Sequence, residues 1–256
     1  MSSVCNIIVA MAAPTLKPVT TRSALLTLLL GAEVARLSTR ELVAGASIVG
    51  FAEPTVRVAL SRMAAAGDVV RDADGGYRLS DRLVARQRRQ EEAAHPSLRD
   101  WDGTWELVAV TTAGRTASER ADLRATLSEL RLAELREGLW TRPANLDLTW
   151  PGVVAEVCER FTGAAPAADP AGLAARLWDL DAWAAAARRL LDATATDDPV
   201  LRFTACATSG RHLLADPVLP AALLPADWPG DALRASHVAY KQWVVDMRRS
   251  LTDAAG

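Results

Sequence analysis

The order of elements between residues 20 and 79 constrains the fold of this chain more than any other feature of its sequence. Apolar residues repeat there at helical spacing in three segments, and a segment with strand spacing follows. The predicted elements are helices over residues 20–31, 38–48 and 54–66 and hairpin strands over residues 69–71 and 77–79. Helix, helix, turn, helix and hairpin within about 60 residues is the order of a winged helix-turn-helix.

Local signals mark the ends of these elements. Ser38 and Glu41 have the spacing of a capping box, in which the hydroxyl and the carboxylate bind the free amides at a helix start. Pro54 falls in the first turn of the third helix, where proline is tolerated. The Asp-Gly-Gly run at 74–76 tolerates positive φ and therefore suits the turn of the hairpin.

The third predicted helix has one apolar face and one polar face. The apolar face consists of Val56, Ala59, Leu60 and Met63, and the outward residues are Thr55, Arg57, Ser61 and Arg62. Arginine can contact base edges and phosphates, and hydroxyl groups add short polar contacts. Two arginines on an exposed helix face are more commonly just solvated surface residues. The prediction that this face binds double-stranded DNA therefore depends on the turn before the helix and the hairpin after it. Arg71 and Arg78 of the hairpin are candidates for contacting a phosphate run or a minor groove, with ordinary surface charge as the alternative.

Aromatic residues and charge both divide the chain near residue 95. All eight tryptophans lie at or beyond Trp101. Residues 14–95 carry 12 basic and 9 acidic residues, whereas residues 96–256 carry 17 basic and 22 acidic residues. This small excess of basic residues suits the N-terminal third to phosphates.

Beyond residue 95 the pattern predicts a small α+β region and then helices. The α+β region contains a strand over 105–112, a helix over 118–131, one or two strands over 132–142 and a strand over 153–161. Helices over 173–193, 199–215 and 231–251 follow, with a proline-rich connector over 216–229. The predicted fold class is an α+β multidomain chain: a disordered tail (1–19), a winged helix-turn-helix domain (20–95), a small middle domain (96–168) and a helical C-terminal domain (169–256).

No arrangement of residues indicates a catalytic or a metal site. Cys5, Cys158 and Cys206 are scattered, which argues against disulfides and structural zinc and favours the cytoplasm as the location. The three histidines have no carboxylate or cysteine at relay spacing, and no glycine-rich phosphate loop follows a strand. The sequence therefore predicts a protein that is not an enzyme and has no cofactor. It also predicts no membrane segment, since none approaches the roughly 20 apolar residues of a spanning helix.

Two other classes of function stay open at this point. A metal-dependent nuclease built on the middle domain would need clustered carboxylates at strand ends, and the strand over 105–112 offers only Glu106. An adaptor would regulate through protein contacts, and a gel-shift experiment with genomic DNA would distinguish it from a DNA-binding regulator.

Five segments of the sequence together resemble the PaaX family, which comprises repressors of phenylacetate-degradation genes and their relatives. The segments read TVRVALSRMAAAGDVVRDADGGYRLS, WDGTWELVAV, EGLWTRP, LWDLDAW and DPVLPAALLPADWPG. The last of these, over 216–230, is more specific than a helix-turn-helix. The chain departs from the family over 145–152, which is too short for a full second helix of the middle domain, and over 207–212.

The resemblance implies a ferredoxin-like middle domain and a homodimeric repressor of an aromatic-compound catabolic operon. It also implies an effector, an aryl acyl-CoA such as phenylacetyl-CoA, that releases the repressor. The candidates for effector binding are Arg176, Trp178, Trp183, Arg211 and His212, with Arg188 and Arg189 as further candidates for the phosphates. Packing in a core is the alternative role for each tryptophan, and ordinary surface charge is the alternative for each basic residue.

Overall fold

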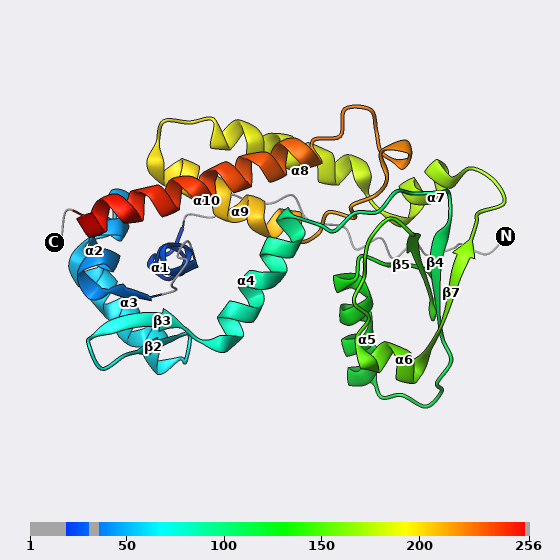
Figure 1. The fold of residues 1–256 in the computed structure, drawn as a ribbon, viewed down its shortest axis with the longest axis horizontal. Helices are drawn as coiled ribbons and strands as arrows, with labels where there is room; N and C mark the ends of the chain where they lie inside the picture. The colour runs from blue at the N-terminus through cyan, green and yellow to red at the C-terminus, as the bar shows by residue number, and fades with distance from the viewer. Residues whose placement is uncertain (1–18, 31–35, 254–256) are drawn as a thin grey trace. The chain divides into compact units, whose positions relative to one another are not determined.

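The computed structural model describes residues 19–30 and 36–253, which form two compact units. The N-terminal unit contains the described residues of segments 14–95, 186–214 and 229–256, and the central unit contains residues 96–185 and 215–228. Each unit contains helices and one small antiparallel sheet (Figure 1). The predicted tail lies almost entirely outside the described residues, as does the expected helix end at Gly31.

The first part of the N-terminal unit follows the predicted order of elements. Its elements are α1 (Thr21–Leu30), β1 (Arg36–Ser38), α2 (Thr39–Ile48), α3 (Glu53–Ala65), β2 (Val69–Arg71), β3 (Gly76–Leu79) and α4 (Asp81–Ala94). The capping box of Ser38 and Glu41 is present at the start of α2, and Pro54 lies in the first turn of α3. Strand β1 was not predicted from the sequence; it pairs with β3 and makes a three-stranded sheet in the order β1-β3-β2.

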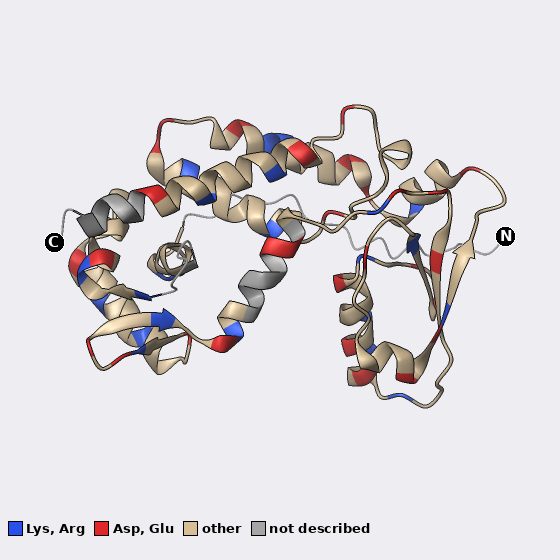
Figure 2. Cartoon of the chain, in the orientation of Figure 1, with Lys and Arg blue, Asp and Glu red and all other residues tan. Residues whose placement is uncertain are grey.

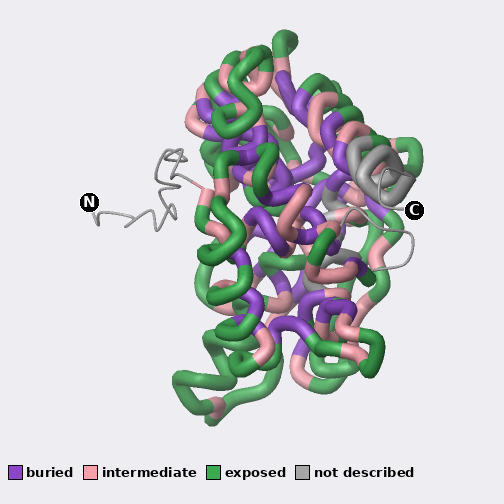
Figure 3. Tube along the Cα trace, turned by 90° about the vertical axis from the view of Figure 1, so that its left-hand side faces the viewer, coloured by how far each residue is buried: buried purple, intermediate pink, exposed green. Residues whose placement is uncertain are grey.

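A core of apolar side chains holds these elements together. Its buried residues include Leu25, Leu28, Leu29, Leu42, Val56, Leu60, Met63, Val69 and Leu79. Buried positions alternate with exposed ones along the helices (Figure 3), as expected for helices that each bury one face.

Two helices from the C-terminal part of the chain complete the N-terminal unit. These are α9 (Pro199–Leu213) and α10 (Gly230–Asp253). Phe203 of α9 and Tyr240 of α10 pack edge to face, with ring centroids 5.9 Å apart, and lie in one cluster with Ala24 and Val49. The described residues before position 95 therefore bury part of their apolar surface against the C-terminal helices. The domain boundaries expected from the sequence stay predictions.

The central unit has a β-α-β-β-α-β order. Its elements are β4 (Trp105–Val110), α5 (Ala117–Glu129), β5 (Ala133–Arg136), β6 (Leu139–Pro143), α6 (Gly152–Val157) and β7 (Cys158–Ala164), followed by α7 (Pro170–Leu177) and the 3-10 helix η1 (Ala221–Leu223). All neighbouring strands in the order β5-β6-β4-β7 are antiparallel. Leu123, Leu127 and Val154 of the two helices pack with Val108 and Trp140 on one face of the sheet. This is the order that the ferredoxin-like domain implied by the resemblance requires.

Two secondary-structure predictions were wrong in this region. Residues 153–157 belong to helix α6, and only Cys158–Ala164 forms a strand. The apolar run is too short to show whether its period is that of a helix or of a strand. The structure forms about one and a half helical turns there, with Pro151 as the N-cap residue and Val154 buried.

The predicted helix over 173–193 is two helices, α7 and α8 (Leu180–Thr194). Trp178 between them has extended backbone (φ −126°, ψ 136°), and the Asp179 carboxylate accepts a hydrogen bond from the amide of Ala182. An aspartate that caps the second helix in this way competes with continuation of the first.

Candidate nucleic-acid interface

The outward face of α3 carries the residues that the sequence predicts to contact DNA. Thr55, Arg57, Ser61 and Arg62 are all exposed. The opposite face of the helix is anchored in the core, where Val56, Leu60 and Met63 are at most 2 % exposed. The packing therefore fixes which face of α3 is presented to solvent, while the role of that face stays a prediction.

Arg57 is held by an acidic neighbour on the same helix. Its guanidinium lies 2.7 Å from the Glu53 carboxylate, one turn earlier, and both side chains are more than half exposed. An exposed pair of this kind stabilises a helix by only about 0.3–0.5 kcal/mol. Arg57 can therefore exchange Glu53 for a phosphate at low cost.

The two hairpin arginines lie on opposite faces of the three-stranded sheet. In an antiparallel pair, residues directly opposite each other share a face. Arg71 is opposite the buried Tyr77, whereas Arg78 is opposite Val70 on β2 and Arg36 on β1. Both arginines are exposed, but they cannot act together from one face of the sheet.

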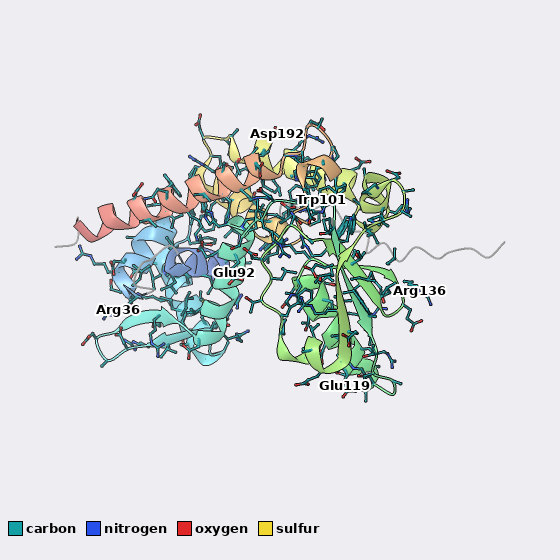
Figure 4. All side chains as sticks on the ribbon, turned by 45° about the vertical axis from the view of Figure 1, so that its right-hand side comes forward. Arg36, Glu92, Trp101, Glu119, Arg136 and Asp192 are labelled. Atoms are coloured by element: carbon teal, nitrogen blue, oxygen red, sulfur yellow. The ribbon has the colours of Figure 1, made fainter. Side chains whose placement is uncertain are left out.

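Arg36 is a basic residue of this sheet that sequence reasoning missed. It is labelled in Figure 4 and lies beside Arg78, 2.5 Å from the Asp72 carboxylate. The hydrogen bond to Asp72 raises the pKa of Arg36, and the same bond lowers the pKa of Asp72. A three-residue strand gives too short a pattern to recognise in a sequence, so nothing local indicated this position.

A buried carboxylate between α3 and β2 links three elements of the N-terminal unit. Asp68 is 4 % exposed and accepts hydrogen bonds from Arg22 of α1 at 2.8 Å and Arg82 of α4 at 2.7 Å. The hydrogen bond from Arg22, followed by the charges of both arginines, lowers the pKa of Asp68. The residue therefore stays ionised at neutral pH and joins α1 and α4 to the start of the hairpin.

An open cavity of approximately 670 Å³ lies between the start of α1 and α3. Residues Thr20–Arg22 line one side of it, and Thr55, Val58 and Arg62 are among the α3 residues on the other. Acidic and basic residues are interspersed over this part of the chain (Figure 2), so charge alone does not outline the interface.

The candidate effector residues are divided between the two units. Arg176, Trp178 and Trp183 belong to the central unit, while Arg188, Arg189, Arg211 and His212 belong to the N-terminal unit. Arg176, Arg188, Arg189 and Arg211 are exposed, and His212 is buried. Their role as an effector site stays a prediction.

Tryptophans of the central unit form an aromatic core. The rings of Trp183 and Trp228 stack with centroids 4.5 Å apart, and Trp178 lies 6.4 Å from the buried Trp105. The indole N–H groups of Trp105 and Trp228 are buried, and no described residue accepts a hydrogen bond from either. Trp183 is 3 % exposed, so its side chain is packed in the interior.

A buried polar network holds the start of the proline-rich connector, residues 216–218. Asn145 and Arg142 both donate to the carbonyl of Val218, at 3.0 and 3.3 Å, and Arg131 donates to the carbonyl of Asp216. The Asp216 carboxylate accepts the amide of Val218, which has a left-handed backbone (φ 49°). Burial lowers the pKa of Arg142 to about 9. The network holds residues 216–218 against β6 and the residues that flank it.

The described residues contain no group of three or more His, Cys, Asp or Glu side chains that could hold a metal ion. In the same part of the chain, no helix is both long enough and apolar enough to cross a membrane. Cys158 and Cys206 are free and buried, whereas Cys5 lies outside the described residues.

The two units, each with helices and a sheet, define a multidomain α+β protein, and comparison with known families gives its class. The family described as PaaX-like protein matches residues 20–83, the PaaX protein central Cas2-like domain matches 98–158, and the PaaX-like protein C-terminal domain matches 178–251. The chain belongs to the PaaX family, which confirms the resemblance found in the sequence.

Among solved structures, the chain is similar to the uncharacterized protein Rv0674 from Mycobacterium tuberculosis. The two sequences are 48 % identical, the match covers 93 % of this chain and 100 % of that chain, and the TM-score is 0.80. No curated protein matches the chain.

Proposed function

We propose that this chain is a transcriptional regulator that binds double-stranded operator DNA through a winged helix-turn-helix formed by α1–α3 and the β2–β3 hairpin. The observation that carries the proposal is the α3 face, where exposed hydroxyl and guanidinium groups lie opposite a fully buried apolar stripe. A helix held in this way can enter a major groove without disturbing the core. Membership of the PaaX family supports the same class of function.

The finer parts of the proposal follow the family. The protein acts in the cytoplasm as a homodimeric repressor of an aromatic-compound catabolic operon, and an aryl acyl-CoA such as phenylacetyl-CoA releases it from DNA. Two copies match a palindromic operator whose half-sites lie about one helical turn, or a multiple of it, apart. Exposed arginines on α7, α8 and α9 suit the phosphates of a coenzyme A thioester, and the aromatic part of the effector is expected from the family.

Substitution of the α3 arginines tests DNA binding. Arg57→Ala and Arg62→Ala should weaken operator binding while thermal stability is kept, because both side chains are exposed. A base contact should cost roughly 1–3 kcal/mol and relax specificity at one position, whereas a phosphate contact should weaken binding on all sequences and reduce the salt slope by about one.

The assay is fluorescence anisotropy with DNA from upstream of the chain's own gene, at several salt concentrations. Arg136→Ala is the matched control, since Arg136 (labelled in Figure 4) is an exposed arginine on β5 of the other unit. Operator affinity that is unchanged in both α3 variants would refute the assignment.

Phenylacetyl-CoA titrated into the complex should release the DNA, and the absence of release at millimolar ligand would eliminate that effector.

A further inference from the structure

Val58 is an apolar side chain in the middle of the exposed face of α3. It is 51 % exposed, while Val56 and Leu60 on either side of it are 0 % and 1 % exposed. Successive helical residues are rotated by about 100°, so Val58 projects about 160° away from both Val56 and Leu60. Val58 therefore points directly away from the core.

Three of the four helix-surface neighbours of Val58 are polar, and the fourth is the exposed Pro54, four residues before it. Thr55, Ser61 and Arg62 lie three residues before, three residues after and four residues after it, which places them next to Val58 on the helix surface. Thr55, Val58 and Arg62 line the same side of the cavity between α1 and α3. Arg57 lies about 100° round the helix from Val58, at the margin of this face.

Neither packing against the described residues nor helix stability accounts for a valine at this position. The side chain is half exposed, and a branched residue is a weaker helix former than alanine, lysine or glutamate. Among the base edges of a major groove, only thymine presents an apolar group, its C5 methyl, and small apolar side chains contact it.

We infer that Val58 contacts the C5 methyl of a thymine in each operator half-site and so contributes to sequence specificity. This inference rests on the proposed function, because it requires that α3 enters the major groove. Thr55, Ser61 and Arg62 supply the polar contacts around it, and Val58 distinguishes thymine from cytosine at one position.

A methyl scan of the operator tests the inference. Each thymine of a bound operator is replaced in turn by deoxyuridine, which removes only the methyl group, and affinity is measured by fluorescence anisotropy. For the unmodified protein, one position in each half-site should show a loss of roughly four-fold, the effect of burying one methyl group. Val58→Ala should bind the normal operator more weakly by a similar factor and should not distinguish thymine from deoxyuridine at that position.

Val153→Ala is the matched control, because Val153 of α6 is 38 % exposed and lies in the other unit. It should keep the full response to deoxyuridine. Circular dichroism should show that Val58→Ala is folded, since alanine favours the helix. A Val58→Ala protein that still responds to the methyl group as the unmodified protein does would overturn the inference, as would an operator in which no deoxyuridine position matters. If the unmodified protein showed no sequence-specific binding to any DNA, the proposed function itself would fail.

Discussion

Replacing Asp68 by asparagine removes the charge that joins α1, α4 and the hairpin of the N-terminal unit. Arg22 and Arg82 lie 2.8 and 2.7 Å from the two oxygens of this carboxylate, whose side chain is 5 % exposed. A hydrogen bond to a charged group contributes about 1.5–3 kcal/mol, but the two arginines are 46 % and 68 % exposed, so solvent screening reduces the contribution of each. In the variant, the side-chain carbonyl oxygen of the asparagine can still accept a hydrogen bond from one arginine. Its NH2 group faces the other arginine, and neither of these two groups can accept a hydrogen bond. We expect a loss of about 2 kcal/mol of unfolding free energy at pH 7.

The pH dependence of this loss follows from the lowered pKa of Asp68. The folded-state pKa lies below the unfolded value of about 3.9, so the stabilisation is fully present above the unfolded pKa and disappears as pH falls through the folded pKa. The difference between the two proteins should therefore be constant from pH 7 down to about pH 5 and shrink below about pH 4.

Urea unfolding followed by circular dichroism at several pH values measures the difference, and hydrogen exchange of α1 shows where the unit opens. Asp74→Asn is the control, because Asp74 is 88 % exposed and lies 3.7 Å from Arg36. This control should change stability by less than about 0.5 kcal/mol. An Asp68→Asn protein as stable as the unmodified protein at pH 7, or a deficit that persists undiminished under acid, would show that the buried carboxylate does not join these elements.

Two further predictions concern buried polar groups. Asn145→Ala should lower the unfolding free energy by about 2–3 kcal/mol, because it removes the hydrogen bond donated to the carbonyl of Val218 and the side-chain acceptor of Arg142. Thermal unfolding measures this loss, and an unchanged melting temperature would contradict the prediction. Burial raises the pKa of Cys206 to about 12, so its thiol should stay protonated and unreactive to iodoacetamide at pH 8 in the folded protein and react once the protein is denatured. Mass spectrometry of the labelled peptides measures this, and rapid labelling of the native protein would count against the buried position.

Elements whose signals are local could be predicted closely from the amino-acid sequence. A hydroxyl three residues before a glutamate, a proline in a first helical turn and an Asp-Gly-Gly run each act within a few residues, and they mark α2, α3 and the β2–β3 hairpin. The 3.6-residue repeat likewise predicts the exposed face of α3, because a helix at the surface of a domain buries only its apolar face.

Features that depend on contacts between distant segments could not be predicted in this way. Strand β1 exists because β3 pairs with it, and this pairing places Arg36 beside Arg78 and leaves Arg71 on the other face. The break at Trp178 was likewise invisible in the apolar repeat, which continues through it.

The same reason explains the buried polar groups and the course of the C-terminal helices. Asp68 meets Arg22 across 46 residues, and Asn145 meets Val218 across 73 residues, so no local pattern indicates either pair. Helices α9 and α10 pack in the same unit as α1, although they begin about 170 and 200 residues after it ends. Periodicity shows that a helix has an apolar face, but the partner that covers the face is fixed only when the whole chain is folded.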